Sequence, residues 1–209
     1  RYALINQGFD VLNVSLADDV PSNIKIIVIA ELKEPLTEIE EIHLERYIAR
    51  GGNLFITCEP NRSEVMNVLL EKFGVQLSSG TLVQLNENFS PDLIVAKPTR
   101  EAAELNYYFD EMKRNDRCLA MSGVAGLEYD GNKGYHVIPL FISDSLTWNE
   151  VETINFVDER PVLSASMGEI QKSYATVLAL TREVCNKEQK IMILGDADCI
   201  SNGELSMNR

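Results

Sequence analysis

The feature that most constrains the fold is the alternation of apolar strand-like runs with helical runs over residues 24–75. The run 24–30 is apolar on both faces apart from one lysine, which is typical of a parallel strand covered by helices. The run 53–58 has a similar character, and a helical run follows each of the two. Strands that alternate with helices in this way predict an α/β protein with a parallel sheet.

Capping and stop residues mark the ends of the helical runs. Thr37, with a glutamate three residues later, has the spacing of a capping box, so we expect a helix to begin after it. Gly51 and Gly52 provide the expected stop for that helix. Ser63 is the predicted cap of a second helix, which Gly74 closes.

The rest of the chain is less regular. Residues 10–16 predict a short strand, and residues 99–115 predict one charged helix. Two apolar runs, 175–180 and 191–194, are joined by a polar turn too short for a helical crossover, so we expect an antiparallel hairpin. The chain is therefore interpreted as one domain over residues 1–209. It has a regular part (1–75), a less regular part (76–175) and closing strands (175–202).

Charge excludes one class of partner. The chain has 19 Lys and Arg against 32 Asp and Glu, a formal net charge of −13. Because nucleic-acid binding needs a basic footprint on phosphate, we expect no nucleic-acid partner. No run reaches the roughly 18 apolar residues of a membrane helix. The ends, Arg1 and Arg209, carry neither a starting methionine nor a signal peptide, so we interpret the chain as a segment of a longer protein.

The candidate nucleophiles lack the surroundings that catalysis requires. Ser122 has no glycine two residues before it, so it does not match the nucleophile elbow. Cys58 ends a strand, but the neighbouring Glu59 would raise its thiol pKa rather than lower it. No motif joins His43 or His136 to an acid or a thiol, and no phosphate-binding loop follows a strand. We therefore predict no catalytic residue and no cofactor.

Carboxylates that follow strands form the strongest candidate site. Asp196 and Asp198 come directly after the apolar run that ends the hairpin, and Glu31 and Glu59 follow two earlier strands. In open α/β sheets ligands bind at the carboxyl ends of strands, and a hard cation such as Mg²⁺ would suit these oxygens. The alternative is structural: Asp198 caps a following helix and Asp196 holds the turn. We favour the structural interpretation.

A series of short motifs, in a fixed order, resembles a known family. The firmest similarity lies in residues 24–75 and 190–202, and the whole chain follows the same order. The chain resembles the GldG-like auxiliary components of ABC-2 type transporters, the gliding-motility ABC transporter family. The motifs are Gly-Phe-Asp-Val at 8–11, Pro-Leu-Thr at 35–37, Tyr-Ile-Ala-Arg-Gly-Gly-Asn-Leu at 47–54, Glu-Pro at 59–60, Leu-Leu at 69–70, Phe-Gly-Val at 73–75, Gly-Asp-Ala-Asp at 195–198 and Ser-Asn at 201–202.

The resemblance implies a fold and a place in the cell. The family fold is a three-layer α/β/α arrangement, flavodoxin-like or class I amidotransferase-like, here with a mostly parallel sheet and some antiparallel strands in the C-terminal half. The implied function is a non-catalytic binding or interaction domain in the periplasm, anchored in the inner membrane by segments outside this chain.

The resemblance also implies partners. They are the permease and ATPase subunits of the same system. The resemblance does not identify a transported substrate. The alternative function is an amidotransferase-like or metal-dependent hydrolase that uses the acidic edge of the sheet.

Overall fold

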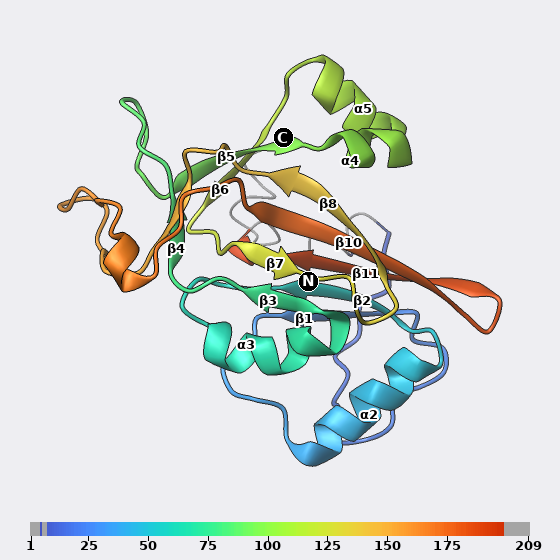
Figure 1. Cartoon of the computed structure of the whole chain (residues 1–209). Coiled ribbons are helices and arrows are strands. Elements are labelled where there is room, and N and C mark those ends of the chain that lie inside the picture. The colour runs from blue at the N-terminus through green and yellow to red at the C-terminus, as the bar shows by residue number, and fades with distance from the viewer. Residues whose placement is uncertain (1–4, 6–7, 199–209) are drawn as a thin grey trace.

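The computed structural model describes residue 5 and residues 8–198, and a nine-stranded mixed sheet runs through its centre (Figure 1). A separate two-stranded sheet pairs β4 (Thr81–Val83) with β9 (Trp148–Glu150). The strands of the large sheet are β1 (Ile26–Ala30), β2 (Asn53–Thr57), β3 (Val75–Leu77), β5 (Leu93–Pro98), β6 (Leu119–Ser122), β7 (Leu127–Tyr129), β8 (His136–Ile142), β10 (Ala175–Val184) and β11 (Lys187–Leu194). The helices are α2 (Glu38–Ala49), α3 (Ser63–Leu70), α4 (Arg100–Leu105) and α5 (Tyr107–Arg114), with short 3₁₀ turns η1 (Glu71–Phe73) and η2 (Ala165–Met167).

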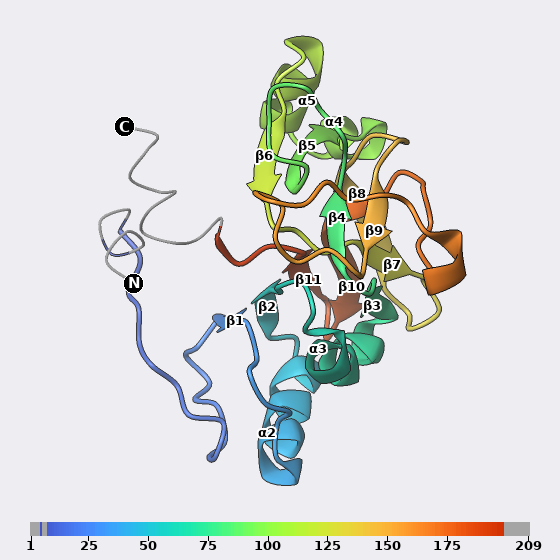
Figure 2. The same ribbon diagram turned by 90° about the vertical axis from the view of Figure 1, so that its left-hand side faces the viewer.

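The predicted mostly parallel sheet is wrong. The strand order is β1-β2-β11-β10-β8-β5-β6, and only the neighbours β1, β2 and β11 run parallel. Every other pairing in the described part of the chain is antiparallel. The pairing of β10 with β8 shifts register near Ala175, where β10 also pairs with β7. Register shifts of this kind bend a sheet, and the sheet curls instead of lying flat between two helical layers (Figure 2).

The predicted three-layer α/β/α architecture is also wrong, because the helices do not cover both faces. Helices α2 and α3 lie together on one side of β1, β2 and β3, whereas α4 and α5 lie at the opposite end of the molecule, beside β5 and β8 (Figure 1). On β1 the side chains of Ile27 and Ile29 are buried, but Ile26 is 55% exposed and Val28 is 46% exposed. The outer face of this edge strand therefore has no helical layer over it.

The buried apolar side chains form two hydrophobic cores. The larger joins α2 and α3 to β1, β2 and β11 and includes Leu44, Ile56 and Phe73. The smaller fills the region between β5, β6, β8 and α4 and includes Ile94 and Leu140. No helix among the described residues is long and apolar enough to span a membrane.

The local predictions for residues 37–53 are confirmed. The Thr37 side chain accepts from the Glu40 amide while the Glu40 carboxylate accepts from the Thr37 amide, so the capping box is complete. Gly51 has a φ of +86° and ends the helix in the left-handed region that glycine favours. Gly52 is required for a different reason: a Cβ there would lie 2.3 Å from the ring of Tyr47.

The predicted C-terminal hairpin is confirmed as well. Strands β10 and β11 pair antiparallel from Val177–Leu194 to Val184–Lys187. Gln189 on β11 is fully buried, and its amide donates to the carbonyl oxygens of Ile48 (2.9 Å) and Gly52 (2.6 Å). These bonds fasten the end of α2 to the sheet. The last residues of the predicted closing strands, 199–202, lie outside the described residues.

Three local predictions are wrong. Residues 10–16 form no strand, and Leu16 instead packs beside α2. The single helix predicted over 99–115 is two helices, because Asn106 takes an extended conformation and caps α5 with its side chain. Ser63 is the first residue of α3 and not its cap; the cap position is Arg62, which makes no capping bond with its side chain.

Candidate functional site: carboxylates at the strand ends

The three parallel strands bring the predicted carboxylates to one edge of the sheet. Glu31 follows β1, Glu59 follows β2, and Asp196 and Asp198 follow β11. Because β2 lies between β1 and β11, the carboxyl ends of all three strands meet there. The structure thus places the four residues at neighbouring strand ends, but it does not bring all of them together.

Three of the four carboxylates form a close cluster. The side-chain oxygens of Glu59, Asp196 and Asp198 lie within 4.8 Å of one another. Asp196 is buried, Glu59 is half-buried and Asp198 is exposed, so the cluster opens to solvent on the Asp198 side. Below we call these three residues the acidic cluster.

Glu31 is not part of the acidic cluster and instead pairs with Arg62. The Arg62 Nε donates to Glu31 Oε1 at 2.9 Å, an ion pair that neutralises the carboxylate locally. The backbone of Glu31 has a φ of +59° and its amide donates to the Thr57 carbonyl, so the chain turns directly after β1. Glu31 still contributes negative potential to the site, but it is not one of the three clustered side chains.

Gly195 fixes the loop that carries the two aspartates. Its amide donates to the Thr176 carbonyl at 2.9 Å, and its own carbonyl accepts from the Ala125 amide at 2.8 Å. A Cβ at Gly195 would lie 2.0 Å from the Ala125 carbonyl oxygen. No other residue fits so close to a neighbouring backbone, so the direction of the chain after β11 is set by this glycine.

The acidic cluster holds its own turn with hydrogen bonds. The Asp198 amide donates to Asp196 Oδ1 at 2.7 Å, and the Ala197 amide donates to Glu59 Oε1 at 3.2 Å. Two backbone donors therefore compensate part of the negative charge. This is the arrangement that the structural interpretation of Asp196 requires, while the predicted cap role of Asp198 concerns residues outside those described.

Electrostatics make Glu59 the most perturbed member of the acidic cluster. Burial above all, together with the charges of Asp196, Asp198 and Glu31, raises the pKa of the Glu59 carboxyl to about 7, against the opposing hydrogen bond from the Ala197 amide. At neutral pH the Glu59 carboxyl is therefore partly protonated. Three carboxylates at this spacing can bind a proton or a hard cation such as Mg²⁺ or Ca²⁺.

The two candidate nucleophiles, Cys58 and Ser122, have different surroundings. Cys58 is fully buried, and burial, together with the neighbouring Glu59 charge, raises its thiol pKa to about 12. Ser122 is exposed and donates to Asp92 at 3.3 Å. His43 Nδ1 lies 2.8 Å from the Leu16 carbonyl oxygen and its Nε2 lies 3.7 Å from Asp19.

His136 is exposed on β8, opposite Thr181. Among the described residues no hydrogen bond joins either histidine to the thiol or the hydroxyl. A neutral, buried thiol without an imidazole partner is a poor nucleophile.

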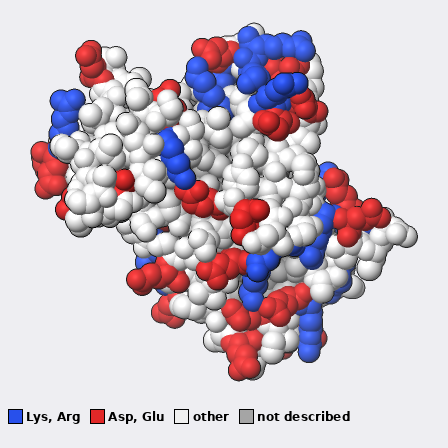
Figure 3. All heavy atoms as spheres, in the orientation of Figure 1, with Lys and Arg blue, Asp and Glu red and all other residues white. Residues whose placement is uncertain are grey.

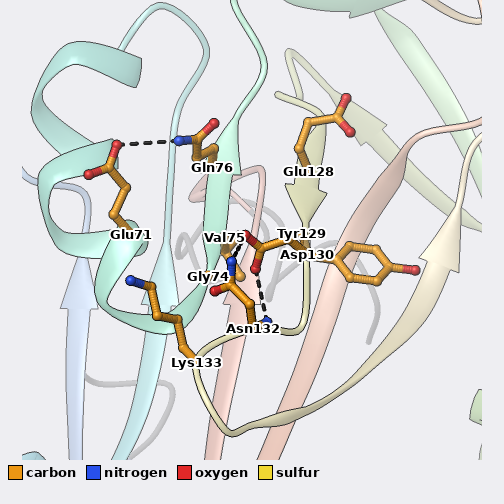
Figure 4. A pocket seen from close by; sticks show the side chains of 9 residues that line it. All are labelled: Glu71, Gly74, Val75, Gln76, Glu128, Tyr129, Asp130, Asn132 and Lys133. Atoms are coloured by element: carbon orange, nitrogen blue, oxygen red, sulfur yellow. Dashed lines mark hydrogen bonds between the residues drawn. The ribbon is translucent and has the colours of Figure 1, made fainter.

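A polar groove lies against the paired strands β3 and β7, beside η1 and the turn after β7 (Figure 4). It encloses about 370 Å³ and is lined mainly by polar side chains. These groups largely bond to one another: Gln76 donates to Glu71 at 3.3 Å, and the Asn132 amide donates to Asp130 at 3.1 Å. Glu128 pairs instead with Lys172, which lies outside the groove. The sequence carries no signal for this groove, because its residues come from two segments far apart in the chain.

Sequence analysis also missed a pair of buried glutamates, Glu150 and Glu169, which are 2% and 3% exposed. Glutamate is almost never fully buried unless its carboxylate is paired or hydrogen-bonded. No spacing in the sequence distinguishes them from the many exposed glutamates. A possible signal was the length of irregular chain between β9 and β10, because long loops in compact proteins are usually functional.

Comparisons with known proteins agree with this fold. The chain is similar to the solved mmIFT52 N-terminal domain, with 15% identity, a TM-score of 0.60, and coverage of 88% of this chain and 71% of that one. It is also similar to a putative ThuA-like protein from Bacteroides uniformis, with 11% identity, a TM-score of 0.50, and coverage of 94% and 72%. At these identities the likeness concerns the fold alone, and it supports the curled mixed sheet over a flavodoxin-like one.

A search of curated proteins found no match. A family model for auxiliary components of ABC-type transport, described as "ABC-type uncharacterized transport system", matches residues 1–208. That match covers nearly the whole chain and includes every described strand of the sheet. The chain therefore belongs to the family of ABC-type transport auxiliary proteins.

Proposed function

We propose that this chain is a non-catalytic, extracytoplasmic interaction domain of an ABC-2 type transporter auxiliary subunit of the GldG-like kind. The observation that carries the proposal is the family match over residues 1–208. In this proposal the domain contacts other components of the transport system, and hydrolysis of ATP belongs to a partner subunit.

The chemistry of the candidate groups supports a role without catalysis. Cys58 is buried with a raised thiol pKa, and among the described residues no hydrogen bond joins it to His43 or His136. The acidic cluster uses its oxygens to accept backbone amides in its own turn. These features favour a scaffold that presents surfaces to partners.

The proposed partners are the permease and ATPase subunits of the same system. The test is co-purification of the full-length protein with these subunits from a membrane extract in mild detergent. We expect all subunits to elute together, and a matched preparation in which the domain 1–209 is deleted should lose the auxiliary protein from the complex. Free elution of the intact protein would contradict the proposal.

The proposed location is the periplasm, with an inner-membrane anchor in segments outside this chain. The cysteines allow a direct test, because Cys118 and Cys185 are exposed and Cys58 is buried. In a Cys199→Ser background, a membrane-impermeant maleimide should label the full-length protein in intact cells, and Cys118→Ser with Cys185→Ser should abolish this labelling. Labelling only after lysis would place the domain in the cytoplasm.

The acidic cluster is the specific observation that favours a second candidate, a metal-dependent hydrolase. In that case Glu59, Asp196 and Asp198 would hold the cation. A cation bound only by the folded protein must raise its thermal midpoint, so Mg²⁺, Mn²⁺ and Ca²⁺ titrations separate the two functions.

A further inference from the structure

The segment between β9 and β10 forms a projecting loop with an unusually apolar surface. We call residues 151–170 the projecting loop; it lies at the left of Figure 1 and includes η2. Val157 is 92% exposed, Ile154 is 84% exposed and Val162 is 74% exposed. Three further apolar side chains of the loop are also exposed: Leu163, Met167 and Ile170.

Two buried carboxylates fix the base of the projecting loop. Glu150 accepts the backbone amides of Glu152 (3.1 Å) and Thr153 (2.9 Å), where the loop leaves β9. Glu169 accepts the amides of Val151 (3.1 Å) and Ser164 (2.6 Å), so it ties the outgoing chain to the returning chain. Burying a charged carboxylate costs free energy unless such donors are present. The four backbone donors therefore indicate that the base of the projecting loop has a defined structure.

Neighbouring side chains strengthen this base. The Ile170 amide donates to Asn149 Oδ1 at 2.8 Å, and the Tyr174 hydroxyl donates to the Ile170 carbonyl at 2.7 Å. The Trp148 indole donates to Glu150 Oε2 at 3.2 Å, and Asn149 and Trp148 are both buried. The projecting loop is therefore anchored to the two-stranded sheet on both sides.

The tip of the projecting loop is also ordered. The Val157 amide donates to Asn155 Oδ1 at 3.2 Å, and the Asn155 side-chain amide donates to Asp158 Oδ2 at 2.8 Å. The Glu159 amide donates to the Asn155 carbonyl at 3.1 Å and closes the turn. Asn155 thus holds a turn that presents the Val157 side chain outward.

An ordered loop with solvated apolar side chains is suited to binding. Large exposed apolar patches on monomers mark interaction sites, and a surface that is already ordered loses less entropy when it binds. The space-filling view shows a largely uncharged surface on the left-hand side of the molecule, with basic and acidic groups gathered at its outer left edge (Figure 3). The exposed side chains Ile154, Val157 and Val162 belong to neither hydrophobic core of the domain.

The charges at the tip identify the kind of partner. Asp158, Glu159 and Arg160 are consecutive and exposed, and they lie between Val157 and Val162. Insertion into a lipid bilayer would desolvate all three charges, which disfavours a membrane as the binding surface. A protein surface can instead satisfy them, and the excess of acid over base at the tip favours basic side chains around an apolar recess.

We propose that the projecting loop docks into an apolar recess, bordered by lysine or arginine side chains, on another subunit of the same transporter. This inference rests on the proposed function, because that function supplies the partner. Val157 and Val162 enter the recess, and Asp158 and Glu159 pair with its basic border.

The test measures binding of the full-length protein to the co-expressed permease and ATPase subunits in detergent. The double variant Val157→Ser/Val162→Ser should weaken this binding by about tenfold or more, because both side chains lose the apolar area that they would bury in the recess. The charge reversal Asp158→Lys/Glu159→Lys should weaken it too and reduce its dependence on salt. Ile39→Ser on α2, where the side chain is 59% exposed, is the matched control and should leave binding unchanged.

The outcomes separate the inference from the proposed function. If the wild-type protein binds and both loop variants bind equally well, the projecting loop is not the docking surface, although the proposed function stands. If the wild-type protein does not bind the subunits, both fail. Loop-dependent binding to lipid vesicles, with or without anionic lipid, or loop-dependent self-association in light scattering would also overturn the inference. Unchanged thermal midpoints of the variants confirm that folding is not the cause.

Discussion

Replacing Glu59 by glutamine should stabilise the protein at alkaline pH and have little effect at acid pH. In the folded protein the Glu59 carboxyl has a pKa of about 7 instead of 4.5, because it is half-buried and faces the charges of Asp196, Asp198 and Glu31. Glutamine keeps an oxygen that can accept from the Ala197 amide, so the substitution removes the charge while preserving the contact.

The sign follows from proton linkage. A carboxyl whose folded pKa is raised binds its proton more tightly in the folded state than in the unfolded state. Folding stability is therefore lost as the pH rises from the unfolded pKa of about 4.5 to the folded pKa of about 7, and it is constant above that window. The Glu59→Gln variant has no such group and escapes this loss.

The magnitude follows from the size of the pKa shift. A shift from 4.5 to about 7 corresponds to an upper bound of about 3.4 kcal/mol, at 1.36 kcal/mol for each pH unit. Glu59 is partly exposed, and solvent screening reduces the interaction of such charges, so we expect about 1 kcal/mol.

The assay is urea unfolding of the wild-type protein and the variant at a series of pH values. The free energy of unfolding of Glu59→Gln, relative to wild type, should rise by about 1 kcal/mol between about pH 5 and about pH 8. Glu87→Gln, in the exposed loop between β4 and β5, is the control and should show no such trend. If the difference in unfolding free energy between Glu59→Gln and wild type is constant across this range, the pKa of Glu59 is not raised in the folded protein and the reasoning is wrong.

Three other outcomes are expected. Gly52→Ala should lower the free energy of unfolding by about 2 kcal/mol in urea titrations, since its Cβ would displace the buried Tyr47 ring; an unchanged midpoint would mean that the ring moves freely. Gln189→Met should cost about 2 kcal/mol in the same assay, because the Gly52 carbonyl loses its side-chain donor and the Arg182 guanidinium loses its acceptor; retention of wild-type stability would show that water replaces them. Mg²⁺ should leave the thermal midpoint unchanged, because oxygens of the acidic cluster already accept backbone amides; a rise that Asp196→Asn abolishes would establish a cation site instead.

The parts of the fold that could be predicted from the sequence are those set by local chemistry. The helix after Thr37 depends on a cap and a glutamate three residues apart, and its end depends on Gly51. The hairpin of β10 and β11 was predictable because its turn is too short for any other connection. In these segments the interacting groups are neighbours in the chain, so spacing carries the information.

The order and direction of the strands could not be predicted in the same way. Strand β11 inserts between β2 and β10, so Leu54 pairs with Ile191 across a long stretch of sequence. A strand that is apolar on both faces can lie in a parallel or an antiparallel sheet, and composition does not distinguish the two. The prediction of a second helical layer was wrong for the same reason. The local sequence does not show that the outer face of β1 is left uncovered.

The acidic cluster was predictable in part. Glu59 and Asp196 meet because their strands are parallel neighbours. The rule that parallel strand ends share an edge predicts the common edge, but it does not predict that β2 and β11 are neighbours. The separation of Glu31 was not predictable, because Arg62 reaches it only through the position of the first turn of α3. Ion pairs of this kind depend on tertiary placement and leave no pattern in the sequence.

The buried carboxylates of this fold share one use. Glu150 and Glu169 accept backbone amides at the base of the projecting loop, and Asp196 accepts one in the turn after β11. In each case a charge is buried where irregular backbone must keep one shape without a helix or strand to supply partners. An acidic residue that is committed to holding a loop is less available to a substrate. The acidic cluster, which resembles a catalytic site by its spacing, therefore shares this structural role through Asp196.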